Sequence, residues 1–248
     1  MRPRALSVLK FGGMKRLLLV TLLAIPGFAA QFSNNLSSAD VERITETLGF
    51  GGASRLMRSA EPYEGFPGIK IGVEAALTPS TSLNALGDGT GSLPNFIPSP
   101  RLYLAKGLFE NFELIGNLFT PSILDTLSSV GLLMKWTFWD EMETLLSAAF
   151  YGGYTRLTAF RGAYTGNDLE VGALLSKDYV RMKPYLGAGW LIANGNVSPD
   201  FAPQDRSTWQ STIHFFAGIE LEFPVQVTLQ VDMMDMRPQG SILIAKHF

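Results

Sequence analysis

The chain contains no cysteine and only two histidines among its 248 residues. The absence of cysteine excludes disulfide bonds, and it excludes a lipoprotein anchor, which needs a cysteine at the cleavage site. Two imidazoles are a small supply for acid–base or metal chemistry. The sequence therefore predicts neither a metal site nor a cofactor.

Residues 1–30 are predicted to be a cleaved signal peptide, with Met14 as a second candidate start. Two basic residues follow Met14, the apolar stretch 17–25 comes next, and small residues stand at 27 and 29. The apolar stretch is too short to span a membrane, which takes about 20 residues. Removal of residues 1–30 leaves about 15 positive charges against 22 negative ones. A net charge near −7 argues against a nucleic-acid partner.

The remaining chain lacks a long apolar run, so the sequence predicts no membrane-spanning helix. Charged residues are also scarce, at 17% of the chain against 46% hydrophobic residues. An exported chain this apolar must bury its hydrophobic surface in a large core or turn it toward lipid as a β-barrel.

Residues 31–66 do not show the pattern of a strand. Ser37 and Asp40 resemble a helix-capping box, and the residues that follow place three apolar side chains on one helical face: Val41, Ile44 and Leu48. The helix is predicted to stop at Gly49 and at Gly51-Gly52, and residues 53–60 are predicted to form another turn or two. This segment is either a periplasmic extension or a plug in a barrel mouth.

Residues 67–248 read as a series of alternating apolar and polar positions, which is the pattern of β-strands. In 225–234, for example, Val225, Val227 and Leu229 alternate with Gln226 and Thr228. Turn-forming residues separate the segments. Ten strands are expected, within a range of eight to twelve, at residues 69–77, 101–107, 112–118, 131–138, 146–151, 169–176, 185–192, 213–222, 225–234 and 242–248.

Two features favour a barrel in lipid over a soluble sandwich. Connections are predicted to alternate between long and short, as in outer-membrane barrels, and 80–97 and 195–210 are the expected long loops. Charged side chains fall on the face opposite the apolar one, where a water-filled interior would receive them. The predicted lumen-lining residues are Lys70, Glu74, Arg101, Glu113, Lys135, Glu170, Glu220 and Asp232.

Aromatic residues gather near the ends of the expected strands, as at membrane interfaces, and the chain ends in Phe248. With its export signal and alternating strands, it resembles the small Gram-negative outer-membrane β-barrel proteins. The resemblance covers residues 69–248 and implies a closed antiparallel up-and-down barrel, preceded here by a short helical segment. It implies location in the outer membrane, contact with outer-membrane lipids and lipopolysaccharide, and Phe248 as the signal for the barrel-assembly machinery. Lys246 departs from the family pattern, because an apolar or aromatic residue is usual there.

The sequence contains one candidate site for hydrolysis. His214 is expected to oppose Asp232 or Met234 near the outer rim, with Asp235 as a further acid. This resembles the rim site of omptin-like proteases, and Ser211 would make a lipase-like set. A structural His–Asp contact explains the pattern more simply, and three nearby methionines (Met233, Met234 and Met236) are better explained by packing than by a soft-metal site.

The sequence therefore predicts a monomeric barrel that is not an enzyme. Its expected role is structural or surface-binding. A barrel of about ten strands is only slightly larger than one that side chains fill completely, so at most a narrow passive channel is expected. The alternative is an outer-membrane barrel hydrolase with the rim site around His214 and Asp232.

Overall fold

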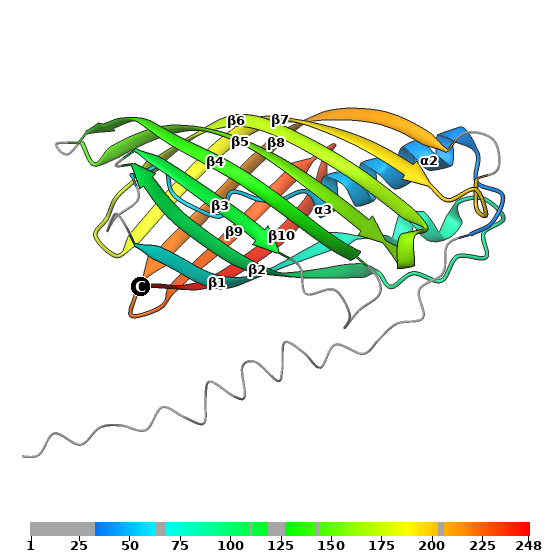
Figure 1. Ribbon diagram of the computed structural model, residues 1–248, viewed down its shortest axis with the longest axis horizontal. Helices are drawn as coiled ribbons and strands as arrows, with labels where there is room; N and C mark the ends of the chain where they lie inside the picture. The colour runs from blue at the N-terminus through cyan, green and yellow to red at the C-terminus, as the bar shows by residue number, and fades with distance from the viewer. Residues whose placement is uncertain (1–32, 63–67, 110, 119–126, 142–143, 203–205) are drawn as a thin grey trace, which may run out of the picture.

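The computed structural model describes residues 33–62, 68–109, 111–118, 127–141, 144–202 and 206–248. Within these residues ten antiparallel strands form one closed barrel, in which each strand pairs with its neighbours in the chain and β1 pairs with β10 (Figure 1). The all-β barrel that the sequence predicts is confirmed. The strands are β1 (Ile69–Pro79), β2 (Phe96–Phe109), β3 (Phe112–Leu118), β4 (Leu127–Glu141), β5 (Leu146–Ala159), β6 (Tyr164–Lys177), β7 (Met182–Val197), β8 (Ser207–Glu222), β9 (Gln226–Met234) and β10 (Arg237–His247).

The alternation of side chains explains the two surfaces of the barrel. Successive side chains of a strand point to opposite faces, so the apolar set of each strand lies outside and the charged set inside. Val231 is 58% exposed and Leu186 61% exposed, whereas Asp232 and Glu74 are fully buried. This outward apolar surface is the reverse of a soluble protein, which buries its apolar face.

The two ends of the barrel carry different connections. At the turn end β1 begins, β10 ends and short connections join β2 to β3, β4 to β5, β6 to β7 and β8 to β9. The loop end carries residues 80–95, which include the short helix η2 (Thr81–Ala85), and the connection that follows Val197. Figure 1 shows the turn end at the left and the loop end at the right.

Several predicted connections are shorter in the structure because the strands extend further. The loops expected at 80–97 and 195–210 lose residues to β2, β7 and β8. The turn expected at Arg237 is wrong, since β10 already begins there and the chain turns at 235–236 instead. The connection between β5 and β6 is likewise short, and part of it forms η3 (Phe160–Gly162). Long connections are therefore not the rule at the loop end.

The N-terminal segment 33–62, which we call the plug, lies inside the barrel. It begins with α2 (Ser38–Ile44), continues through the π-helical turn η1 (Thr45–Gly49) and ends its helical part with α3 (Phe50–Gly52). The predicted capping box is confirmed: the Asp40 amide donates to the Ser37 hydroxyl, and the Ser37 amide donates to the Asp40 carboxylate. Among the described residues, no helix has the length and apolarity needed to cross a membrane.

The prediction that residues 53–60 form further helical turns is wrong, because the chain there is not helical. Its backbone groups bind side chains of the wall instead. The Ser54 amide donates to Thr155 Oγ1 at 3.0 Å, and the Ala60 carbonyl accepts from Thr137 Oγ1 at 2.7 Å. Buried backbone groups need partners, and in this segment the barrel supplies them.

The plug runs through the lumen from the loop end to the turn end. At the loop end the Leu36 amide donates to the carbonyl of Phe201, and the Gly91 amide donates to Ser33 Oγ. At the turn end the Ala60 amide donates to Ser176 Oγ, next to the last residue of β6. The described segment that precedes β1 therefore begins at the end of the barrel opposite to the start of β1.

Outward aromatic side chains gather at the turn end. Trp136 stacks on Phe112 with ring centroids 6.0 Å apart, and Phe138 stacks on Phe150 at 4.5 Å. Such girdles mark the level of lipid headgroups. Trp190 departs from the prediction, because it lies in the middle of β7 rather than near its end.

Candidate functional site: the filled lumen

The lumen of the barrel holds a network of charged side chains that joins the wall to the plug. All eight predicted lumen-lining residues are buried, with exposed fractions of 6% or less. Five of them have partners on the plug, in the segment between Gly52 and Glu61, and these five are Arg101, Glu113, Lys135, Glu220 and Asp232. The network divides into a part near the loop end, a part around His214 and a part near the turn end.

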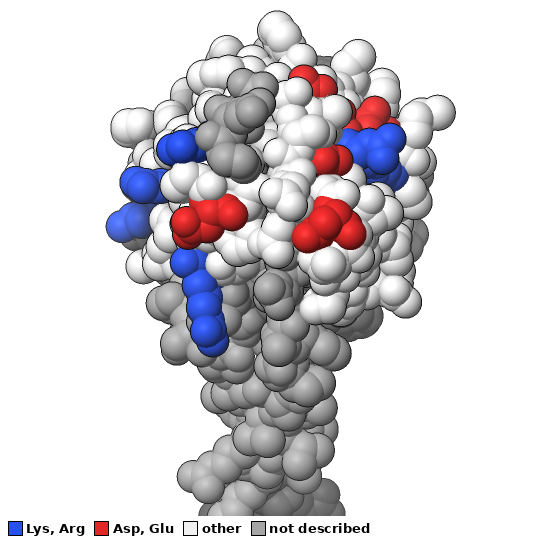
Figure 2. All heavy atoms as spheres, turned by 90° about the vertical axis from the view of Figure 1, so that its right-hand side faces the viewer, with Lys and Arg blue, Asp and Glu red and all other residues white. Residues whose placement is uncertain are grey.

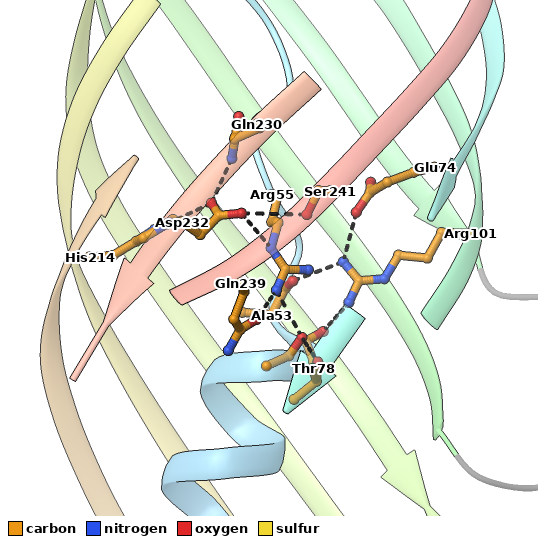
Figure 3. A network of polar contacts seen from close by, with 12 residues as sticks. Ala53, Arg55, Glu74, Thr78, Arg101, His214, Gln230, Asp232, Gln239 and Ser241 are labelled. Atoms are coloured by element: carbon orange, nitrogen blue, oxygen red, sulfur yellow. Dashed lines mark hydrogen bonds and ion pairs between the residues drawn. The ribbon is translucent and has the colours of Figure 1, made fainter. Parts of the chain in front are cut away.

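Arg101 of β2 makes the main contact near the end of the helix. Its guanidinium donates to the carbonyl of Gly52 at 2.6 Å and to that of Ala53 at 2.8 Å, and it lies 3.4 Å from Glu74 of β1. Figure 3 shows these groups converging where the helix ends. The last carbonyls of a helix have no helical partner, so Arg101 acts as a cap supplied by the wall.

Arg55 of the plug makes the second contact, toward β9 and β10. Its Nε lies 3.1 Å from Asp232 Oδ2, its Nη2 donates to the carbonyl of Gly51 at 3.1 Å, and it also binds Gln239 (Figure 3). Gln230 donates to the other oxygen of Asp232 at 2.6 Å. The carboxylate of Asp232 thus has four partners, since His214 and the Ser241 hydroxyl bind it as well.

His214 bridges two carboxylates in the middle of the barrel. Its Nδ1 lies 2.6 Å from Glu170 Oε1, and its Nε2 lies 2.9 Å from Asp232 Oδ1. The hydroxyl of Tyr151 donates to the same oxygen of Glu170 at 2.5 Å. His214 is 2% exposed. It lies in the middle of β8 and opposes Met234, the last residue of β9.

The part near the turn end binds the extended half of the plug. Lys135 of β4 donates to the carbonyls of Ser59 at 2.9 Å and Glu61 at 2.7 Å, and its Nζ lies 3.2 Å from Glu113. Further ion pairs there are Arg58–Glu113 at 3.0 Å, Lys70–Glu220 at 3.7 Å and Lys183–Glu61 at 2.6 Å. Apolar plug side chains fill the remaining space among wall residues, and they are Leu56, Met57 and Ala60.

The other predicted site residues lie elsewhere. Asp235 is exposed in the turn after β9, where its carboxylate lies 3.5 Å from Arg237. Ser211 is exposed on the outward face of β8. Phe248 is 68% exposed, and its backbone exchanges hydrogen bonds of 2.8 and 3.1 Å with Ile69, which helps to close the barrel.

The structure also separates the three methionines, since Met234 is buried at 2% exposure and Met236 is 88% exposed. The predicted signal peptide, residues 1–30, lies outside the described residues.

Sequence reasoning missed the plug's own charged residues, of which the main ones are Arg55, Arg58 and Glu61. A signal was present: two arginines three residues apart stand in an otherwise uncharged stretch of the plug. Charges rarely become fully buried unless they are paired, and the wall had an excess of acidic residues to receive them.

A small internal cavity lies between the plug and the wall. Polar residues on its lining are Ser54, Thr155, Asp168 and Glu170, and its size suits roughly one water molecule. In the described residues it is the plug, rather than free space, that occupies the barrel interior.

The loop end is covered by helix and loops. Leu36, Val41 and Ile44 of the plug join a buried apolar cluster with residues of the loops and strand ends. Arg237 donates to Thr47 Oγ1 at 2.8 Å and pairs with Glu46 at 3.2 Å. Figure 2 shows this end, where acidic and basic side chains both lie among a larger number of uncharged ones.

No protein-family model matches the chain, and no curated protein matches it. Solved structures give matches of low identity. The translocator domain of the autotransporter NalP from Neisseria meningitidis is 11% identical, with 85% of this chain and 95% of that chain covered and a TM-score of 0.42. The attachment invasion locus protein Ail of Yersinia pestis is 13% identical, with 73% and 97% covered and a TM-score of 0.30.

A loop-deletion mutant of OmpT, an outer membrane protein of Vibrio cholerae, is 12% identical, with 61% of this chain covered and a TM-score of 0.31. The match spans only 54% of that chain. These likenesses concern the fold alone. By its own strand order and its outward apolar surface, the described chain has the architecture of an outer-membrane β-barrel.

Proposed function

We propose that the protein is an integral outer-membrane β-barrel with a structural or surface-binding role, closed along its length by its own N-terminal plug. The observation that carries the proposal is the division of the wall into an apolar outside and a charged inside whose charges are used to hold the plug. The exported, monomeric state and the use of Phe248 in barrel assembly are parts of the same proposal.

The distribution of outward charges supports placement in a membrane. A lysine or arginine that faces lipid at the midplane costs about 2–4 kcal/mol, and much less near the interface. The outward basic residues Lys106, Arg156 and Lys246 stand within four residues of a strand end. Near the ends of the strands they can reach the headgroup region.

The contacts of the plug favour a closed lumen over a passive channel. The wall's cations Arg101 and Lys135 bind plug carbonyls, and Asp232 and Glu113 bind plug arginines. An open pore would require the plug to leave the lumen, which would break all of these charge-assisted hydrogen bonds and ion pairs at once. We therefore expect the intact protein to conduct no ions in discrete steps.

The same contacts disfavour the hydrolase alternative. Both nitrogens of His214 are engaged by carboxylates, and Asp232 is bound to Arg55 as well. A general base must reach the proton that it abstracts, whereas these groups are buried behind the plug. We propose a structural role for His214, in which it braces β6, β8 and β9.

The test uses membrane-extracted, detergent-solubilised protein. We expect heat-modifiable gel mobility, which reports a stable barrel. We also expect no conductance steps when the protein is inserted into a planar lipid bilayer. Mature protein that stays soluble without detergent would refute the membrane placement. Discrete conductance steps from the unaltered protein would refute the closed lumen.

A further inference from the structure

One strand of the barrel is longer than its neighbour at the loop end. β8 pairs with β7 from Met182 to Asn196, so its residues Ser207–Ile213 all have partners on that side. On the other side its pairing with β9 stops at His214, which opposes Met234. Beyond this pair β9 ends, and the chain turns at 235–236 into β10. The segment Ser207–Ile213 is therefore an open sheet edge.

The open edge extends beyond the short β9–β10 turn at the loop end of the barrel. A stretch of seven residues in a strand spans roughly 23 Å. Figure 1 shows β7 and β8 reaching further toward the loop end than β9 and β10. In the described part of the chain, no backbone hydrogen bond joins Ser207–Ile213 to a segment other than β7.

The chemistry of this edge is that of free backbone amides and carbonyls. In an antiparallel sheet, successive residues direct their N–H and C=O groups to opposite neighbours, so about half of Ser207–Ile213 direct theirs to the open side. Natural proteins protect exposed edges with charges, prolines or bulges. The edge has no charge and no proline, since its sequence is Ser-Thr-Trp-Gln-Ser-Thr-Ile, and its pairing with β7 contains no bulge. Helix α2 packs against β8, but among the residues that the structure describes no backbone hydrogen bond joins it to Ser207–Ile213.

The side chains of the edge carry no charge, which favours an uncharged partner. Trp209 is 71% exposed and Ile213 59% exposed on the outward face, and Thr208, Gln210 and Thr212 lie on the other face. Aromatic and β-branched cross-strand neighbours stabilise strand pairs, as do paired threonines. A partner strand with an apolar side chain beside Trp209 and polar side chains on its other face would match both faces of the edge.

We propose that Ser207–Ile213 binds an extended segment of another polypeptide, which adds to the barrel wall as a strand next to β8. This mode of binding takes its affinity from main-chain hydrogen bonds. It deepens the proposed function, since it gives the surface-binding role a partner chemistry and rests on the loop end facing outward.

A second copy of this chain in the same membrane fits the edge poorly. Strands of outer-membrane barrels tilt by about 35–45°. Two copies related by a two-fold axis along the membrane normal would place their edges across each other at a large angle rather than antiparallel. A flexible peptide has no such restriction, and we therefore assign the edge to a separate extended chain.

The test measures hydrogen–deuterium exchange of the full-length protein in detergent micelles. The probe is a synthetic peptide with the sequence of residues 207–213, which can pair antiparallel with the edge so that its isoleucine lies beside Trp209 and its tryptophan beside Ile213. The control peptide has the same side chains with alternate backbone nitrogens methylated on the pairing edge. We expect the probe to slow exchange of the 207–213 amides at least about tenfold, and the control peptide to have no effect.

Two proline variants check that the probe binds to the open side of β8. Gln210 and Ser211 direct their amides to opposite neighbours, so one of Gln210→Pro and Ser211→Pro removes a donor from the open side and leaves pairing with β7 intact. That variant should keep heat-modifiable mobility and lose the protection by the probe. The other variant should disturb the β7–β8 ladder.

Three results would overturn the proposal. Amides of 207–213 that are as protected in the free protein as those of 214–222 would mean that the edge is closed. Equal effects of the probe and the methylated peptide would exclude strand addition. Self-association of the protein that the probe abolishes would assign the edge to a second copy. Because the measurement is made in micelles, its failure leaves the membrane placement standing.

Discussion

At the residue scale, Arg101 links the two parts of the molecule. It lies on β2, yet two of its hydrogen bonds go to carbonyls of the plug, Gly52 and Ala53, and its ion pair goes to Glu74 on β1. All of these groups are buried. Removing one member of a buried pair leaves the other charge uncompensated, which costs far more than the pair itself contributes.

Replacement of Arg101 by leucine should lower the free energy of unfolding by about 3–5 kcal/mol, because Glu74 and two plug carbonyls lose their partner. Urea unfolding in detergent micelles, followed by tryptophan fluorescence, measures the change. Lys106→Leu is the matched control, since Lys106 lies on the same strand and faces outward. Equal stability of the two variants would show that the plug is not held by this contact.

Asp88 gives a pH-dependent contact between the loop 80–95 and the start of the plug. Hydrogen bonds from the hydroxyl and the amide of Thr90, and then from the amide of Asn34, hold the pKa of the Asp88 carboxyl below its ordinary value. A carboxyl with a lowered pKa stabilises the fold above the unfolded pKa, which is about 4, and loses that effect as the pH falls through the folded pKa.

We therefore expect the Asn34 amide to keep a constant protection factor from neutral pH down to the ordinary pKa of aspartate, and to lose protection only at lower pH. Hydrogen exchange corrected for the intrinsic rate measures this. In Asp88→Asn the protection should no longer depend on pH in the acidic range. A loss of protection near neutral pH would contradict the assignment.

At the scale of elements, the helix of the plug fits the wall because the wall carries glycine at the points of closest approach. A Cβ atom on Gly195 of β7 would lie 2.1 Å from Thr45 Oγ1 and 2.7 Å from the hydroxyl of Tyr164. Real Cβ atoms do not come so close, so any side chain at 195 must displace η1 or Tyr164.

Gly195→Ala should cost about 1–3 kcal/mol, the usual effect of overpacking a well-filled interior. Gly116→Ala is the control, because it is also a strand glycine and its Cβ would meet its nearest neighbour only at 3.9 Å. The temperature at which the heat-modifiable band shifts on a gel compares the stabilities of the two variants. An unchanged transition in Gly195→Ala would mean that the helix does not press against β7.

The sequence determines the strands more fully than it determines the plug. Alternation is a local signal, and in β9 it runs without interruption from Gln226 to Met234. The extended form of residues 53–60 depends on partners such as Thr137 and Lys135, which are distant in the sequence. Their number and position follow from the register of the barrel, which no local pattern contains.

The buried position of His214 and the open edge of β8 follow from register in the same way. Sequence parity placed His214 on the inner face and opposite Asp232 or Met234, and the structure pairs it with Met234 in register and with Asp232 by hydrogen bond. Its depth was predicted wrongly, because the start of β8 at Ser207 lies within a stretch that resembled a loop. Six further residues, 207–212, place His214 in the middle of the strand.

At the scale of the whole molecule, the path of the chain is the unexpected feature. An even number of strands brings the start of β1 and the end of β10 to the same end of the barrel. Because the plug passes back through the lumen, Ser33 instead lies among the loops, with its hydroxyl bound by the Gly91 amide. Ser33 therefore lies at the opposite end of the barrel from Phe248.

This path predicts that Asn34 can be labelled from outside the cell. The chain has no cysteine, so single-cysteine variants can be labelled in intact cells with a polyethylene-glycol maleimide too large for outer-membrane channels. Asn34→Cys and Asp200→Cys, both exposed at the loop end, should react, whereas Thr144→Cys, exposed at the turn end, should react only after lysis. Labelling of Thr144→Cys and not of Asp200→Cys in intact cells would show that the barrel has the opposite orientation in the membrane. Labelling of Asp200→Cys alone would place the start of the plug on the opposite side from the loops, and would contradict a chain that threads its own barrel.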